Sequence, residues 1–172
     1  GMAYITESRR DNGFFPNFSI AQNIAISRSL KDGGYKGAMG LFHEVDEQRT
    51  AEAQRELLAL KCHSVNQNIT ELSGGNQQKV LISKWLCCHP EVIIFDEPTR
   101  GIDVGAKAEI YKVMRQLADD GKVILMVSSE LPEIITVCDR IAVFCEGRLT
   151  QILTNRDDMS EEEIMAWALP HE

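Results

Sequence analysis

Two adjacent glycines, Gly74 and Gly75, begin a stretch with helical periodicity, and Ser73 precedes them at the position of a helix N-cap. The first backbone N–H groups of a helix have no partner inside the helix, and they lie at the positive end of its dipole. Because glycine lacks a Cβ atom, a phosphate oxygen can approach these N–H groups closely. The run therefore indicates either a phosphate-binding helix start or a tight turn without a ligand.

A second group of residues favours the phosphate site. The apolar run Val92–Phe95 is typical of a buried β-strand, and Asp96 and Glu97 follow at its carboxyl end. Ligands of open α/β sheets bind at the carboxyl ends of the strands. A carboxylate there can hold Mg²⁺ on nucleotide phosphates, and a second one can act as a general base toward water. Pro98 fixes the turn that follows, which favours a positioned site over a strand that merely ends in solvated acids.

The elements that position these groups follow from the periodicity of the apolar residues. Residues 1–13 are predicted to hold a strand and a connecting segment, and residues 14–71 to form a helical subdomain. That subdomain contains a helix that opens with a capping box at Ser19 and a helix over residues 45–61, with Ala53, Leu57 and Leu60 on its apolar face. Residues 72–172 are predicted to alternate between helices and strands. We therefore expect an α/β fold, a mostly parallel sheet with helices on both faces plus the helical subdomain.

The predicted elements of residues 72–172 can be given by their ranges. They are a helix after Ser73, strands 92–95 and 123–127, a helix from Ala106 that Gly121 ends, a helix from Leu131, two strands around Glu146-Gly147, and a helix over residues 160–169.

Composition excludes several classes of protein. The chain has 172 residues, 44% apolar and 26% charged, as in ordinary globular proteins. Its net charge of −8 argues against a nucleic-acid partner. No apolar stretch approaches the about 18 residues of a membrane span. The five cysteines have no disulfide-like spacing, and Cys87-Cys88 lacks a second Cys/His pair at ligand distance, so we expect free thiols in a reducing compartment.

The motifs resemble those of a known family. The run LSGGNQQ, followed by EVIIFDEPTRGID, is similar to the signature motif, Walker B motif and D-loop of the ABC-type ATPases, which are P-loop NTPases. The forms GGNQQK and PTRGIDVGAK are similar to the second ATP-binding cassette of the bacterial monosaccharide importers of ribose, galactose, arabinose and allose. The resemblance covers essentially the whole chain. It implies the C-terminal part of a cassette whose ATP hydrolysis energises monosaccharide import, with D-allose as the favoured sugar.

The resemblance also implies roles for individual residues. In dimers of this family, the nucleotide lies between the P-loop of one cassette and the signature motif of the other. The residues expected to bind the nucleotide of a partner cassette are therefore Ser73, Gly74, Gly75 and Gln77, with Asp103 of the D-loop at the same interface. Asp96 is expected to hold Mg²⁺, and Glu97 to act as the catalytic base. The implied cofactors are ATP and Mg²⁺.

Three features depart from the family pattern. The P-loop sequence GxxxxGK[ST] is not found, and the glycine-rich run GGYKGAMG is predicted to be a loop because it follows a helix. Glu7 stands at the Q-loop position, where a carboxylate can still coordinate Mg²⁺. Ser129, in VSSEL, stands where the family has its switch histidine, and it cannot carry the charge of an imidazole. We therefore expect residues 1–172 alone to be inactive and the cassette's own site to be weak.

Partners and location follow from the same resemblance. It implies a second ATP-binding cassette, the permease subunits of a sugar transporter and, indirectly, a periplasmic sugar-binding protein. The protein is expected to be peripheral, at the cytoplasmic face of the cell membrane. In such importers the helical subdomain meets the permease, so Phe14, Phe15 and Phe18 are candidates either for that contact or for the core.

Two alternatives stay open. The first is a non-catalytic cassette that completes the partner's ATP site and acts structurally and allosterically, which the residues at positions 7 and 129 favour. The second is a soluble ABC protein of translation or DNA repair, against which the acidic balance argues.

Overall fold

The computed structural model describes residues 1–32 and 44–170, which form two compact units, Gly1–Val127 and Ser128–Glu172. The predicted loop GGYKGAMG, residues 33–40, lies outside the described residues. None of the helices in the described ranges is both long enough and apolar enough to cross a membrane.

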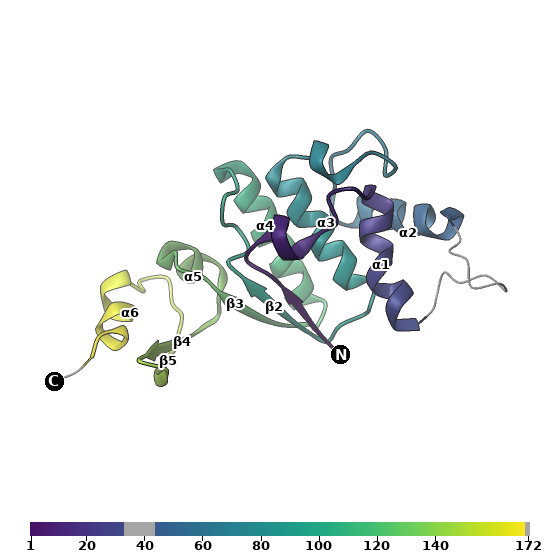
Figure 1. Cartoon of the computed structure of the whole chain (residues 1–172). Coiled ribbons are helices and arrows are strands. Elements are labelled where there is room, and N and C mark those ends of the chain that lie inside the picture. Colours follow the sequence, from purple (N-terminus) through teal and green to yellow (C-terminus); the bar gives the residue numbers. More distant parts are fainter. Residues whose placement is uncertain (33–43, 171–172) are drawn as a thin grey trace. The chain divides into compact units, whose positions relative to one another are not determined.

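A three-stranded parallel sheet in the order β1-β2-β3 forms the centre of the first unit (Figure 1). The strands are β1 (Met2–Ile5), β2 (Val92–Asp96) and β3 (Val123–Val127). In the register, Tyr4 of β1 lies beside Ile94 of β2, and Ile94 lies beside Leu125 of β3. The parallel arrangement that the apolar runs predict is confirmed.

The two faces of this sheet differ. Ile5 and Phe95 are fully buried on the face against which α3 (Gly74–Leu86) and α4 (Val104–Asp119) pack. On the opposite face, Tyr4 is 47% exposed and Leu125 is 51% exposed. Because consecutive strand residues face opposite sides, Asp96 shares the exposed face with its neighbours Ile94 and Tyr4.

The helical region between β1 and β2 contains α1 (Ile20–Asp32) and α2 (Glu44–Leu57), and α1 packs against both α2 and α3 (Figure 1). The predicted capping box at the start of α1 is confirmed, because the N–H of Ser19 donates to Gln22 Oε1 at 3.0 Å and the N–H of Gln22 donates to Ser19 Oγ at 3.2 Å. This region forms part of the first unit together with the sheet.

The second predicted helix of this region is too long. It ends at Leu57, not at residue 61, because Ala59 adopts a left-handed backbone with φ of 47°. Its predicted apolar face is also wrong in part, since Leu57 is 63% exposed while Ala51 and Leu58 are buried. Ala53 is also exposed, so of the three residues predicted for this face only Leu60 is buried.

Two short helical segments have no counterpart among the predicted elements. A π-helical turn, η1, covers Arg9–Gly13 after β1, and a 3-10 turn, η2, covers Ile69–Glu71 before α3. Asn68 closes a capping box with Glu71 in η2.

The phenylalanines of the helical region were expected either in the core or at a contact with a permease, and they differ in burial. Phe14 is buried, with 6% of its surface exposed, whereas Phe15 is 46% exposed and lies against Phe18 with 5.1 Å between ring centroids.

The second unit contains α5 (Leu131–Val137), β4 (Arg140–Cys145), β5 (Arg148–Thr154) and α6 (Glu161–Ala168). β4 and β5 form an antiparallel hairpin whose turn residues, Glu146 and Gly147, both have positive φ. Ser160 caps α6 by accepting from the N–H of Glu163 at 3.2 Å. The core of the second unit consists of Ile141, Val143, Met159 and Ile164. The predicted hairpin and terminal helix are therefore confirmed.

Candidate functional site

The start of α3 presents an exposed serine whose hydroxyl does not cap the helix. Ser73 has the extended backbone of an N-cap residue, and its carbonyl accepts the first helical N–H, that of Gln77, at 2.9 Å. Its Oγ accepts from Asn76 Nδ2 at 2.9 Å and from no backbone N–H of the helix. The side-chain capping expected of Ser73 is therefore absent, and the first N–H groups of α3 are left for another partner.

The two glycines at this helix start have different surroundings. A Cβ on Gly75 would lie 2.5 Å from the Cβ of Ala106, so glycine here permits the close contact of α3 with α4. A Cβ on Gly74 would lie 3.2 Å from Arg9 Nη2 and 3.5 Å from the carbonyl oxygen of Gly101. Packing alone therefore requires glycine at position 75, and the expected contact of both glycines with a phosphate stays a prediction.

Gln77 does not face a ligand. Its side chain is only 4% exposed, and Nε2 donates to the carbonyl of Leu72 at 3.1 Å and to that of Ile69 at 3.4 Å. The predicted phosphate contact of the Gln77 side chain is therefore wrong, since the amide fastens η2 to α3. The amide beside Ser73 is that of Asn76, three residues further along the chain. Spacing alone does not distinguish it from Gln77, because residues three and four apart both lie on the same helix face.

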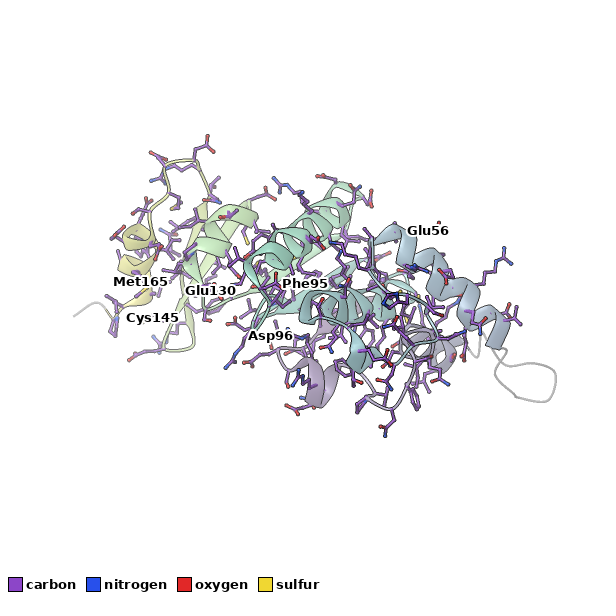
Figure 2. All side chains as sticks on the ribbon, turned by 90° about the horizontal axis from the view of Figure 1, so that it is seen from above. Glu56, Phe95, Asp96, Glu130, Cys145 and Met165 are labelled. Carbon is purple, nitrogen blue, oxygen red and sulfur yellow. The ribbon has the colours of Figure 1, made fainter. Side chains whose placement is uncertain are left out.

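The end of β2 presents the two acids. Figure 2 labels Phe95 and Asp96, consecutive residues of β2 that face opposite sides of the sheet. Asp96 Oδ2 accepts from the hydroxyl of Tyr4 at 2.5 Å. This hydrogen bond raises the pKa of the Tyr4 phenol. Tyr4, which the sequence did not single out, thus orients the carboxylate expected to hold Mg²⁺.

Glu97 adopts an unusual backbone. Its φ is 47°, a left-handed value that costs a residue with a Cβ of order 1–3 kcal/mol. The N–H of Glu97 donates to the carbonyl of Val127 at 2.9 Å, so the end of β3 holds it in place. The strain is consistent with a side chain whose direction matters.

The loop from Glu97 to α4 ends in a helix cap. The N–H of Arg100 donates to the carbonyl of Glu97 at 3.2 Å, and Gly101 has a φ of 66°. Asp103 then caps α4, because its Oδ1 accepts from the N–H of Ala106 at 3.0 Å. Asp103 is exposed at the surface of the first unit, as its expected place at an interface requires.

Arg9 links this loop to the start of α3. Its Nη1 donates to the carbonyl of Arg100 at 2.8 Å, and its Nη2 to that of Gly101 at 3.4 Å, close to Gly74. Burial lowers the pKa of the Arg9 guanidinium. Glu7 forms an ion pair with Arg100 Nη1, so its carboxylate is engaged by the same loop. No sequence pattern pointed to the Arg9 contacts, since η1 itself was not predicted.

Ser129 belongs to the second unit, whereas Glu97, Asp96 and Ser73 belong to the first. Ser129 is exposed, and the neighbouring Ser128 donates through Oγ to Glu133 Oε2 at 3.1 Å. The expected approach of Ser129 to a γ-phosphate therefore stays a prediction.

The donor set fits Mg²⁺ only together with a nucleotide. Within residues 1–32 and 44–170, no cluster of three or more His, Cys, Asp or Glu side chains could hold a metal ion. Mg²⁺ in phosphate sites is bound by one or two carboxylates plus phosphate oxygens and waters, and Asp96 is a carboxylate of that kind. All five cysteines are free thiols.

Comparisons with known proteins find similar sequences. The family model described as ABC transporter matches residues 2–100, more than half of the chain. The D-allose import ATP-binding protein of Escherichia coli is 98% identical over the whole chain, which covers 34% of that protein. The ribose import ATP-binding protein of Bacillus cereus is 47% identical over 97% of the chain, which covers 33% of that protein.

A solved structure shows the same fold. A dimeric ATP-binding cassette in a post-hydrolysis state, bound to ADP and phosphate, has a TM-score of 0.70 at 23% identity. The match covers 90% of this chain and 63% of that one.

Proposed function

Since the chain belongs to the ABC transporter family, we propose that it supplies the signature half of an ATP site shared with a partner cassette. The observation that carries this proposal is the start of α3. There the side chain of the exposed Ser73 accepts no hydrogen bond from a helix N–H, and Gly74 adds no side chain. A phosphate at this point would accept hydrogen bonds from the serine hydroxyl and from helix N–H groups. The helix dipole favours such an anion by about 0.3–1 kcal/mol.

The end of β2 would serve a second ATP, bound by this cassette's own phosphate-binding segment. Asp96, oriented by Tyr4, would hold Mg²⁺, which supplies charge neutralisation to the β- and γ-phosphates when bound. Glu97 would accept a proton from the attacking water, so that ATP and water give ADP and phosphate. The hydrogen bond from the Glu97 N–H to the Val127 carbonyl fixes the backbone position from which this carboxylate extends.

The process we propose is the import of a monosaccharide, D-allose. The support is the 98% identity to the D-allose import ATP-binding protein, against 47% to the ribose counterpart. The proposal includes a second cassette, permease subunits and a periplasmic sugar-binding protein as partners, with the ATPase peripheral at the cytoplasmic face of the membrane.

The test uses the full-length Escherichia coli D-allose import ATP-binding protein carrying residues 1–172 of this chain, assembled with its permease. Ser73→Ala removes one hydrogen bond to a charged group, which should lower ATP turnover about 10- to 100-fold. Ser27→Ala, a serine on α1, is the matched control and should leave turnover unchanged. Full turnover in Ser73→Ala would contradict the proposal.

A non-catalytic cassette remains the second candidate, favoured by Ser129 at the switch-histidine position. Glu97→Gln in the same assembly separates the two. If this cassette hydrolyses ATP, the assembly should lose turnover at one of its two ATP sites. If this cassette is silent, the assembly should lose no turnover. Ser73→Ala should impair the partner's site in either case.

A further inference from the structure

Asn76 is held at both ends of its side-chain amide. Nδ2 donates to Ser73 Oγ at 2.9 Å, and Oδ1 accepts from the backbone N–H of Lys61 at 2.9 Å. An N–H can only donate, so the atom facing Lys61 must be the amide oxygen, and the NH₂ group must face Ser73. The orientation of the amide is thereby fixed from within the first unit.

This orientation determines what the Ser73 hydroxyl can do. A hydroxyl has one proton and two acceptor lone pairs, and Asn76 occupies one lone pair as a donor. The Ser73 proton cannot point at another donor, so it must point away from Asn76. We infer that Asn76 is a positioning residue that keeps the Ser73 O–H directed at the γ-phosphate of the partner's ATP, an inference that rests on the proposed function.

The anchor of this amide is the turn after α2. Lys79 Nζ donates to the carbonyl of Ala59 at 3.0 Å and to Glu109 Oε2 at 2.8 Å. Lys61 Nζ donates to the other oxygen of Glu109 at 2.9 Å. Lys79 is only 3% exposed, so this cation is fixed between α3, α4 and the turn. These contacts therefore fix the position of the turn, and with it the backbone N–H of Lys61 that orients Asn76.

The hydrogen bonds that Glu109 accepts lower the pKa of its carboxyl group. Those from Lys79 and then Lys61 lower its pKa from 4.5 to about 2. The carboxylate therefore stays ionised, and the turn stays tied to α4, throughout the pH range in which a transporter works.

A double-mutant cycle tests the inference in the full-length importer ATPase described above. The variants are Ser73→Ala, Asn76→Leu and the pair, and the measurement is kcat and KM for ATP. Leucine keeps the branched shape and the number of side-chain heavy atoms of asparagine and removes both hydrogen bonds. We expect each single variant to lower kcat about tenfold or more, with little change in KM, because the missing contact is with the γ-phosphate. Asn76→Leu should cost less than about twofold once Ser73 is already alanine.

The controls separate positioning from folding and from the proposed function. Asn66→Leu removes an exposed amide elsewhere in the first unit and should leave kcat unchanged. If Asn76→Leu lowers the melting temperature enough to unfold the protein, Asn76→Ala takes its place in the cycle. Multiplying losses, or full activity in the Asn76 variant while Ser73→Ala is impaired, would overturn only the positioning role. Full activity in Ser73→Ala would overturn the proposed function as well.

Discussion

At the start of α3, the side chains around Ser73 are held by contacts within the first unit. Asn76 is held by Lys61, and Gln77 by the carbonyls of Ile69 and Leu72. At the end of β2, in contrast, Asp96 lies on the exposed face of the sheet and accepts from the half-exposed Tyr4. The start of α3 is thus held in part by the buried amide of Gln77, whereas Asp96 is held by a hydrogen bond to a half-exposed side chain. Both sets of contacts lie within the first unit, so both can be tested in residues 1–172 alone.

Gly75→Ala should have the largest effect on stability. The new methyl group would overlap the Cβ of Ala106, and overpacking of this kind costs about 1–3 kcal/mol of unfolding free energy. Urea unfolding of residues 1–172 measures it. Gly105→Ala is the matched control, because the nearest atom to its new Cβ is Asp103 Oδ1 at 3.5 Å.

A compensating change sharpens this prediction. Ala106→Gly in the Gly75→Ala background removes the overlapping carbon and should restore part of the lost stability. If Gly75→Ala is as stable as Gly105→Ala, the close contact of α3 and α4 is not what requires glycine.

Glu97→Gly should stabilise the fold while it removes the proposed catalytic base. Glycine adopts a φ of 47° without strain, which should raise the unfolding free energy by about 1 kcal/mol. Glu146→Gly relieves a φ of 48° in the β4–β5 turn and is the control. Thermal unfolding should show both gains, and ATP turnover of the full-length protein should fall only in Glu97→Gly. A destabilised Glu97→Gly would mean that contacts of the glutamate outweigh its strain.

The Glu109 contacts predict a pH dependence of stability. The pKa of Glu109 is lowered in the folded state from 4.5 to about 2, so its stabilising contribution is present above pH 4.5 and is lost as the pH falls toward 2. Because Glu109 is 39% exposed, solvent screening limits the contribution to less than about 1 kcal/mol. Urea unfolding at several pH values should show a steeper acid loss in the wild type than in Glu109→Gln. If stability falls equally with pH in both proteins, the hydrogen bonds of Glu109 to Lys79 and Lys61 are not the source of the acid loss of stability.

Tyr4→Phe should have the smallest effect. The hydrogen bond to Asp96 lies at an exposed position, where water can replace it, so its loss should leave the melting temperature of residues 1–172 nearly unchanged. The raised pKa of Tyr4 means that its small contribution is present at neutral pH and is lost as the pH rises through the folded-state pKa. A difference titration of tyrosine absorbance, wild type minus Tyr4→Phe, should show a phenol with a pKa above 10.0. A phenol that titrates at its ordinary pKa would show that the bond does not persist in solution.

Element types were predictable because they depend on local patterns. The apolar runs at β2 and β3, the capping box of α1 and the turn at Glu146-Gly147 each occur within a few residues. The end of α2 was not predictable, since the left-handed Ala59 is held by the distant Lys79.

The site was predictable in its backbone and less so in its side chains. The start of α3 and the acids after β2 could be located because glycine and carboxylate spacing carries the signal. The sequence does not distinguish the roles of Gln77 and Asn76, because which amide of the first turn faces inward depends on η2 and on the turn at Lys61. The need for glycine at position 75 depends likewise on Ala106 of another helix.

The central claim is that Ser73 lies against the γ-phosphate position of ATP held by a partner cassette. Vanadate occupies that position after hydrolysis and, under ultraviolet light, cleaves the backbone beside it. Irradiating the full-length D-allose import ATP-binding protein that carries residues 1–172, with Mg-ATP and vanadate, should give cleavage at Ser73, lost when vanadate is omitted. Cleavage that occurs elsewhere in the chain but never at Ser73 would contradict the account.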